Sequence, residues 1–327
     1  MLLNSLLGRL CYAGRDLFTN EAIAAIFDLD ESRIMLPFLY WYLTYFDWDA
    51  AAAGDHKIKG KTLNKAKLKA LRVIVPPLEE QTRIIAVLDQ AFAALDRARA
   101  HVEANLADAK LLKERGADQL LSRVAANSPT RHLGELAEFR NGLNFSRHSN
   151  GETVKVAGVG DFQRNFWLPI EDLKTICIEG RLSEIDSLCA GDILTVRSNG
   201  NKDLIGRVML VGETEESLSF SGFVIRIRVQ SADVDPEYLC HFMKSQAAVA
   251  HLLAGGGGAN ISNLNQGILS SLPVAIPSAE KQREFVSSMN NLSAKIELLV
   301  EQAEAKISDL ANLRQSLLQK AFSGELT

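Results

Sequence analysis

The chain repeats part of its sequence at a distance of 201 residues, and this repeat limits its possible folds more than any other feature. Shifting the sequence by that distance aligns Pro76 with Pro277 and Gln81 with Gln282. In both copies a short apolar segment leads to the proline, and an acidic residue and the glutamine follow it. Proline ends a strand, and an acidic residue favours the first turn of a helix. The sequence therefore predicts a strand followed by a helix, built twice.

Each copy continues into a segment whose apolar residues recur at alternating gaps of three and four, as in the seam of a coiled coil. The predicted seam consists of Ile85, Leu88, Phe92, Leu95, Val102 and Leu106 in the first copy, and Met289, Leu292, Ile296, Leu299, Leu310, Leu313 and Leu317 in the second. A helix of about 43 residues extends about 60 Å, which is long for a globular domain. Charges at Arg99, Lys113 and Lys306 interrupt the seams. We expect the two helices to pack on each other, antiparallel if a compact domain joins them, rather than to be unrelated surface helices.

The composition predicts a folded protein of two or three units. Of the 327 residues, 47% are hydrophobic and 23% are charged. The formal charge of -4 and the pI near 5.9 lack the basic signature of a typical nucleic-acid-binding protein. The four cysteines form no CxxC pair, and neither a signal peptide nor an apolar run of membrane-spanning length is evident. We expect a protein of the reducing cytoplasm.

Residues 131–278 contain the pattern of a complete α+β domain. Apolar runs bounded by Gly, Asn and Asp predict strands at 154–159, 192–196, 208–211 and 223–229, and Asp235-Pro236 predicts a helix to about residue 253. Residues 1–72 repeat only the rear part of this pattern, because residues 8–10, 23–26 and 38–39 match 206–208, 224–227 and 238–239. They predict strands within 1–12 and 22–29 and a helix at 36–46. We expect 1–72 to be a remnant, without a counterpart of about 131–198, followed by one long helix at 79–124; the other lies at 279–323.

Two equivalent segments differ in chemistry. Residues 54–72 carry seven basic residues and one acid, whereas residues 255–262 are glycine and small residues. Both suit a backbone that approaches another molecule closely, through charge in one case and through bare amides in the other. The alternatives are a solvated charged face and a flexible loop.

The motifs of catalysis and of metal binding are missing from the sequence. It contains no GxxxxGK[ST], GxGxxG or HExxH pattern, and Val75-Pro76-Pro77-Leu78 lacks the asparagine and aromatic residue of an amino-methyltransferase motif. Cys240 and His241 are adjacent, but neighbouring residues on a helix point about 100° apart, so packing is the better interpretation than a zinc site. We expect no catalytic residues, no metal and no cofactor in this chain.

The C-terminal sequence 310–327 resembles the terminal signature of specificity subunits of type I restriction-modification systems. The segments 76–81 and 277–282 resemble the start of that family's two conserved helices, and Gly191-Asp192-Ile193-Leu194, Ser198-Asn199-Gly200 and Gly206-Arg207 resemble its target-recognition domain. The resemblance covers essentially the whole chain. It implies an α+β fold in which target-recognition domains of mixed α/β structure are joined by two long antiparallel coiled-coil helices, with an internal pseudo-two-fold repeat.

The resemblance also implies a function and partners. A specificity subunit recognises a split site in double-stranded DNA, and its helices set the spacing and dock methyltransferase (M) subunits, which bind S-adenosylmethionine and methylate adenine. A restriction (R) subunit cuts the DNA, and the specificity subunit itself is not an enzyme. Because the first recognition domain is a remnant, we expect either a homodimer or a complementing half-subunit. An alternative is a decoy or assembly scaffold that binds M subunits without recognising DNA.

The candidate DNA contacts are loop residues with suitable donors. Acids outnumber bases by 17 to 13 in residues 131–254, so a uniformly basic face is excluded. Arginine pairs with guanine, and asparagine pairs with adenine, in the major groove. The candidates are Arg140, Asn141, Lys155, Arg164, Asn165, Ser198, Asn199, Asn201 and Lys202. For each residue alone, a solvated or turn-capping role is the alternative. The bases recognised do not follow from the sequence.

Overall fold

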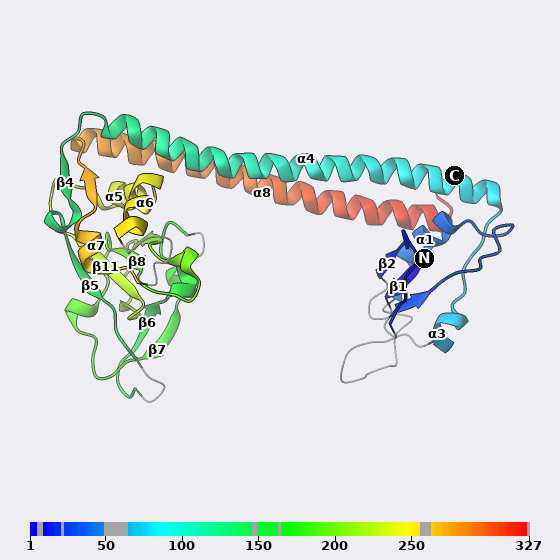
Figure 1. The fold of residues 1–327 in the computed structure, drawn as a ribbon, viewed down its shortest axis with the longest axis horizontal. Coiled ribbons are helices and arrows are strands. Elements are labelled where there is room, and N and C mark those ends of the chain that lie inside the picture. Colours follow the sequence, from blue (N-terminus) through cyan, green and yellow to red (C-terminus); the bar gives the residue numbers. More distant parts are fainter. Residues whose placement is uncertain are drawn as a thin grey trace. The chain divides into compact units, whose positions relative to one another are not determined.

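The computed structural model describes residues 1–4, 9–20, 23–48, 65–145, 149–162, 165–255 and 263–325 (Figure 1). Its contacts divide the chain into two compact units: unit 1 comprises Met1–Asp108 and Leu298–Thr327, and unit 2 comprises Ala109–Glu297. Helices α4 (Leu78–Ala125) and α8 (Ala279–Ser323) each contribute to both units. The two long helices predicted from the apolar spacing are therefore confirmed.

Unit 1 contains a small antiparallel sheet and a cluster of aromatic residues. Its elements are β1 (Leu2–Asn4), β2 (Arg9–Cys11), β3 (Ile23–Ala25), α1 (Leu36–Tyr45) and α3 (Lys65–Ala70), together with parts of α4 and α8. The sheet order is β2-β1-β3. Phe38 of α1 is buried against residues of both long helices, and its ring centroid lies 5.7 Å from that of Phe322. The aromatic helix predicted at 36–46 therefore anchors this unit to the helix pair.

Unit 2 is the larger α+β body. Its strands are β4 (Thr130–His132), β5 (Ala137–Asn141), β6 (Thr153–Ala157), β7 (Lys174–Cys177), β8 (Ile193–Val196), β9 (Val208–Leu210), β10 (Leu218–Phe220), β11 (Val224–Val229) and β12 (Pro273–Ala275). Its short helices are α5 (Pro236–Met243), α6 (Gln246–Gly255) and α7 (Gln266–Ser270). The strands of unit 2 form three sheets, of order β5-β11-β8-β9, β10-β6-β7 and β12-β4. Tyr238 of α5 is fully buried, and its hydroxyl donates to the Ala275 carbonyl at 3.0 Å.

The long helices pack antiparallel within each unit. In unit 1, Arg314 of α8 donates to Asp96 of α4 at 2.8 Å, and its guanidinium lies 4.2 Å from the centroid of the Phe92 ring. In unit 2, a Cβ at Gly116 of α4 would lie 3.3 Å from Leu292 of α8. Since Phe92 meets a late residue of α8 and Gly116 an early one, the two helices run in opposite directions. The antiparallel arrangement expected from the sequence is confirmed (Figure 1).

The buried faces of the two helices differ in part from the predicted seam. Leu88, Phe92, Met289 and Ile296 are buried, and Ile85, Leu95, Val102, Leu106, Leu292, Leu310 and Leu317 are partly buried. Leu299 and Leu313 are 51% and 49% exposed. Ile84, Leu318 and Ala321, which the spacing rule passed over, are buried. An α-helix has 3.6 residues per turn, so over a long segment the buried stripe moves to a neighbouring position of a strict three-four repeat.

Three further expectations need correction. Residues 73–75 do not form a strand, although their counterpart 274–276 overlaps β12 (Pro273–Ala275). The predicted helix to residue 253 is broken into α5 and α6, because the buried Ser245 hydroxyl accepts from the Ala248 amide and begins a new helix. The predicted strand at 22–29 extends only over 23–25.

The repeat is also visible in the sheets. In unit 1 the order β3-β1-β2 corresponds to β11-β8-β9 in unit 2, and all these pairs are antiparallel. Unit 2 adds β5 on the far side of β11, as well as β4, β6, β7, β10 and β12. No counterpart of these six strands is present among the described residues of unit 1. Unit 1 thus repeats the order of three strands of unit 2, and one of these, β8, lies at the end of the segment 131–198 for which the sequence predicts no counterpart.

Candidate nucleic-acid interface

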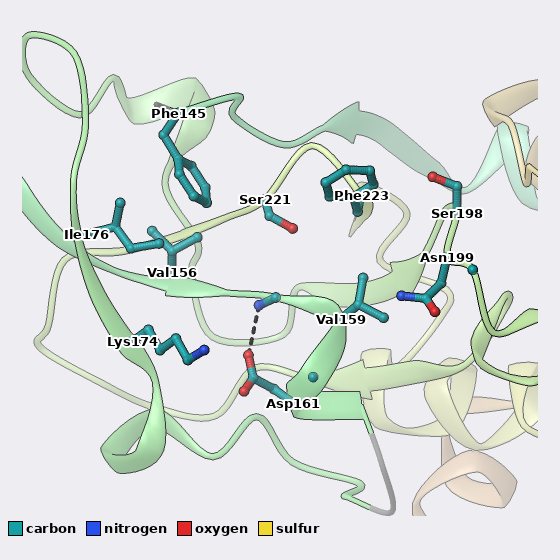
Figure 2. A pocket seen from close by; sticks show the side chains of 13 residues that line it. Phe145, Val156, Val159, Asp161, Lys174, Ile176, Ser198, Asn199, Ser221 and Phe223 are labelled. Carbon is teal, nitrogen blue, oxygen red and sulfur yellow. Dashed lines mark hydrogen bonds between the residues drawn. The ribbon is translucent and has the colours of Figure 1, made fainter. Parts of the chain in front are cut away.

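An open cleft lies in unit 2, between the small sheet β10-β6-β7 and the loop that follows β8. Its volume is about 540 Å³. It is lined by Phe145, Val156, Gly158, Val159, Gly160, Asp161, Lys174, Ile176, Ser198, Asn199, Gly200, Ser221 and Phe223 (Figure 2). Two of the predicted DNA-binding residues, Ser198 and Asn199, thus line one hollow surface. Volumes of this size, with apolar walls and a few polar groups, are typical of binding sites.

Hydrogen bonds within the loop after β8 hold Asn199 in one orientation. The Asn199 side-chain oxygen accepts from the Asn201 amide at 2.7 Å, and the Asn201 side chain accepts from the Asp203 amide at 3.1 Å. Because the oxygen of Asn199 is engaged, its NH₂ group is the part left for a ligand. Figure 2 shows that nitrogen on the side of Asn199 that faces Val159. The loop therefore presents a donor to the cleft.

A tight turn between β10 and β11 places Ser221 and Phe223 in the cleft. The Ser221 amide donates to the Ala157 carbonyl at 2.9 Å, and the Arg197 amide donates to the Phe223 carbonyl at 2.8 Å. A Cβ at Gly142 would lie 2.3 Å from the carbonyl oxygens of Phe220 and Ser221, so only glycine allows this close approach of the backbones. The Phe223 side chain is 61% exposed. A large apolar side chain held by a rigid turn is thus displayed at the surface.

The remaining polar groups of the cleft are Asp161, Lys174 and the Ser221 hydroxyl. One oxygen of Asp161 accepts from the Gly158 amide at 2.8 Å, which fixes the carboxylate (Figure 2). Lys174 lies on β7 and is exposed. The Ser221 Oγ is buried and has no hydrogen-bond partner among the described residues. Buried hydroxyls are normally paired, so this one marks a place where a ligand group would be favourable.

Three arginines of the sheet make hydrogen bonds that stabilise the fold of unit 2. Arg140 of β5 donates to Asp186 at 2.5 Å, and Arg228 of β11 makes two bonds of 2.7 Å to Asp192, which is 1% exposed. Arg226 donates to the carbonyls of residues 185 and 187 at 2.9 Å. Burial, and then the Arg228 charge, lower the pKa of Arg226, whereas the hydrogen bonds to Asp192 raise the pKa of Arg228. These side chains attach the loop 184–192 to the sheet.

The other predicted DNA-binding residues lie outside the cleft lining. Lys155 of β6 lies one residue from Val156 and so points to the opposite face of the sheet, where Glu216 binds its ammonium at 2.7 Å and raises its pKa. Asn165 donates to the Asp161 carbonyl at 3.3 Å. Asn141 and Lys202 are exposed, at the end of β5 and in the turn after Asn201. Arg164 lies outside the described residues, as do Lys57, Lys59 and Lys61 and most of the glycine segment.

Cys240 and His241 are packing residues of α5. Burial raises the pKa of the Cys240 thiol to about 12. Burial also lowers the pKa of His241 to about 3, with smaller contributions from Lys244 and Lys113. The His241 ring stacks on Phe166 with centroids 4.2 Å apart. The described residues contain no cluster of three or more side chains suited to a metal ion.

Five residues of the cleft lining are not among the predicted DNA-binding residues, namely Phe145, Asp161, Lys174, Ser221 and Phe223. Phe223 was assigned to the start of a strand, where an aromatic residue normally enters the core. The signal was the preceding Gly222, which makes a turn out of the sheet. The others come from four different elements, and their convergence depends on how the strands pair.

Among the described residues, the helices lack an apolar stretch long enough to cross a bilayer.

Comparisons with known proteins agree with the repeat and with this domain pattern. The family model of the type I restriction modification DNA specificity domain matches residues 2–103 and 127–308. The specificity subunit of the type I restriction enzyme StySPI from Salmonella potsdam is 26% identical over 282 residues, or 81% of this chain. That of EcoKI from Escherichia coli K12 is 25% identical over 283 residues, again 81% of this chain. The chain spans 60% of the length of each of these two relatives.

Solved structures share the fold. A chain from a structural study of the assembly and conformational transition of a type I restriction-modification system matches with a TM-score of 0.71 at 17% identity, over 88% of this chain and 71% of that one. The HsdS subunit from Thermoanaerobacter tengcongensis matches with a TM-score of 0.54 at 18% identity, over 90% of this chain and 72% of that one. The family model covers both copies of the internal repeat, and the fold agrees with it. The chain therefore belongs to the family of type I restriction modification DNA specificity domains.

Proposed function

We propose that unit 2 recognises a DNA sequence and that the chain acts as a specificity subunit of a type I restriction-modification complex. The observation that carries this proposal is the rigid loop 198–202, which presents the NH₂ group of Asn199 beside the exposed Phe223. Donors held by a preformed loop suit direct recognition of base edges. Membership of the family supports the same role. Positive charge for phosphate contacts would come in part from partner subunits, because unit 2 is acidic.

In this proposal the chain itself performs no chemistry. The paired helices α4 and α8 dock methyltransferase and restriction subunits and separate the recognition surfaces. S-adenosylmethionine binds to the methyltransferase subunit, and the complex works in the cytoplasm. Exposed apolar residues on the helices, such as Leu299 and Leu313, support a docking role, because large apolar side chains on a helix surface favour contact with another protein.

Selection from a random duplex library tests the recognition of DNA. The purified chain should enrich one sequence motif. We expect Asn199→Ala to weaken binding to that motif by about 10-fold, since one base contact is worth about 1–3 kcal/mol. Asn290→Ala on α8 is the matched control, because its side chain donates to Glu237 at 2.9 Å, away from the cleft. Enrichment of no motif by the wild-type chain would reject the proposal.

We further propose that another polypeptide completes unit 1, either as a second copy or as a complementing half-subunit. In unit 2, Val274 is buried, and its strand β12 pairs with β4 in the register Val274↔Arg131. By the shift of 201 residues, Val274 corresponds to Val73, which packs against the core of unit 1, whereas Ile74 and Val75 correspond to Ala275 and Ile276. Ile276 is 8% exposed, but Ile74 and Val75 are 73% and 43% exposed. Phe18 and Phe27 are also exposed there, at 105% and 73%. An unpaired apolar segment and exposed aromatic residues in the same unit favour association.

Size-exclusion chromatography with light scattering tests this second proposal. We expect a mass above that of one chain, or a shift to a heterodimer when a separately encoded half is co-expressed. Ile74→Lys should reduce the association, whereas a lysine at the exposed Leu111 of α4 should not. A stable monomer that still binds its target motif would contradict it. The competing role of a scaffold that binds methyltransferase subunits without recognising DNA predicts association with those subunits and no enriched motif.

A further inference from the structure

The cleft of unit 2 is larger than the recognition of a base edge requires. A stacked base presents only its edge in a groove, so a side chain that reads it needs no cavity. The cleft has a volume of about 540 Å³ and is open to solvent at one side. A cavity of this size accepts a whole planar ring. The walls and polar groups of the cleft determine which ring fits.

The walls of the cleft suit the faces of a nucleobase. Phe145 and Phe223 lie on either side of Ser221, and Val156 and Val159 line the space beside it (Figure 2). Phe223 is 61% exposed and Phe145 is 37% exposed, so both rings are accessible. Bases that have left the duplex stack on accessible aromatic side chains in proteins that bind single strands or extruded bases.

The polar groups of the cleft are hydrogen-bond donors apart from Asp161, whose carboxylate is an acceptor able to pair with a ring N–H of thymine or guanine. Asn199 offers its NH₂ group, because its oxygen already accepts from the Asn201 amide. Lys174 offers an ammonium group. The hydroxyl of Ser221 is able to donate or accept, and it has no partner among the described residues although the side chain is only 6% exposed. Such a set fits a ring that carries oxygen acceptors, namely the keto groups of thymine and guanine.

The cleft is also preorganised. The backbone of Ser221 is fixed by bonds to Ala157 and Val224, at 2.9 and 2.8 Å. The Phe223 carbonyl is fixed by the Arg197 amide, and Gly142 allows the strands to approach closely. Because these groups are already fixed, a ligand that enters the cleft loses little binding free energy to the ordering of loops and side chains.

We infer that this cleft takes up one unstacked keto nucleobase, a thymine or a guanine, from the DNA bound by unit 2. The inference rests on the proposed function and adds a base-holding pocket to it. Phe223 and Phe145 contact the faces of the ring, and Asn199, Lys174 and Ser221 contact its polar edge.

Duplexes with one unpaired nucleotide test the inference, since an unpaired base leaves the stack at lower cost. The full-length chain is titrated, by fluorescence anisotropy, with its selected motif as a paired duplex and with one unpaired dT, dG or dA placed within it. All unpaired nucleotides distort the duplex, so the dA duplex controls for shape. We expect dT and dG to strengthen binding by about 10-fold over the paired duplex, and dA by less than about 3-fold.

Variants identify the site. Ser221→Ala and Phe223→Ala should abolish the preference for dT and dG over dA. The matched controls are Thr195→Val, which removes another buried hydroxyl without a partner among the described residues, and Ile185→Ala, which truncates another exposed apolar side chain. Both controls should keep the preference. Phe223→Ala is decisive if Ser221→Ala fails to fold, because the Phe223 side chain is exposed.

Equal binding of dT, dG and dA duplexes, or a preference that survives in both cleft variants, would overturn the inference. In either case tight binding of the paired motif would leave the proposed function intact. Failure to bind any duplex would instead reject the proposed function, and the inference would fall with it.

Discussion

Gln81 and Gln282 make the same three hydrogen bonds in the two units of the chain. Each side-chain oxygen accepts from a backbone amide at 2.8 Å, that of Met35 in unit 1 and that of Asp235 in unit 2. Each NH₂ group donates at 2.8 Å to the proline carbonyl five residues earlier and to a second carbonyl, of Arg33 or Asp233. Both glutamines are buried, at 0% and 1% exposure. In each unit one side chain thus joins the start of a long helix to the segment before α1 or α5.

Replacement of either glutamine by leucine should loosen only its own unit. Gln282→Leu leaves three backbone groups without their partner, and we expect a loss of about 2–4 kcal/mol in the free energy of unfolding. Hydrogen exchange measured by mass spectrometry should rise in 233–243 for Gln282→Leu and in 33–45 for Gln81→Leu. Gln302→Leu, at an exposed position of α8, is the control. A uniform rise across both units would contradict the local role of these bonds.

The ion pair between Arg228 and Asp192 should contribute more to stability than a surface pair. Asp192 is 1% exposed, so Arg228→Ala would leave a buried carboxylate with only the Cys189 amide as a donor. Because Arg228 itself is partly exposed, we expect a cost of about 2–3 kcal/mol, below the range for fully buried pairs. The comparison is Arg83→Ala, whose pair with Glu80 is exposed and should be worth less than about 1 kcal/mol. Urea unfolding measures both, and equal costs would refute this assignment.

Stability should fall in acid because of His241. Its pKa in the folded protein is about 3, whereas in the unfolded chain it is about 6.5. Between these values the unfolded state binds a proton that the folded state excludes, so the free energy of unfolding decreases as the pH falls from 6.5 towards 3. His241→Phe should remove about 2 kcal/mol of the loss between pH 6.5 and 5.0.

The phenylalanine should fit at position 241, because the ring already stacks on Phe166 and its buried Nε2 has no partner among the described residues. Thermal unfolding at the two pH values measures the effect. His101→Phe, at an exposed position of α4, controls for the removal of an imidazole. If the free energy of unfolding of His241→Phe depends on pH as that of the wild type does, the folded state does not exclude a proton from His241.

The buried and exposed positions of the helix pair should respond differently to truncation. Leu88 is fully buried in the core of unit 1, and Leu88→Ala should cost about 2–5 kcal/mol. Leu299 is 51% exposed, so Leu299→Ala should cost less than about 1 kcal/mol in the chain alone. If Leu299→Ala weakens co-purification of methyltransferase subunits while leaving stability unchanged, the docking role of the helices is supported. Equal destabilisation by both variants would place Leu299 in the helix interface.

The sequence predicted the elements better than the surfaces they form. Local patterns determined the two long helices, the aromatic helix α1 and the start of α5, where Asp235 accepts from the Glu237 amide at 2.8 Å as a capping residue does. The pairing of 273–275 with β4, and the lack of pairing at 73–75, depend on a strand more than 130 residues away in the chain. A local apolar pattern is the same in both copies and does not distinguish them.

The residues of the candidate site likewise divide into those that a local sequence pattern predicts and those that depend on contacts between distant segments. Ser198 and Asn199 were predicted because polar residues before a glycine mark an ordered turn. Arg140 was predicted to bind DNA because arginine pairs with guanine. In the structure it forms an ion pair with Asp186, and the sequence alone does not show that these two residues meet. Phe223 was missed because its exposure follows from the turn at Gly222 rather than from its hydrophobicity. Contacts between distant strands decide which polar groups remain available.

Methylation sequencing of DNA from cells that express this chain with its methyltransferase subunits shows whether the chain directs methylation to a DNA sequence. We expect one new modified motif that is absent from cells without the chain, and loss or relaxation of that motif with Asn199→Ala but not with Asn290→Ala. A methylation pattern that is the same with and without the chain, while the chain still co-purifies with the methyltransferase, would contradict this expectation and would favour the scaffold role.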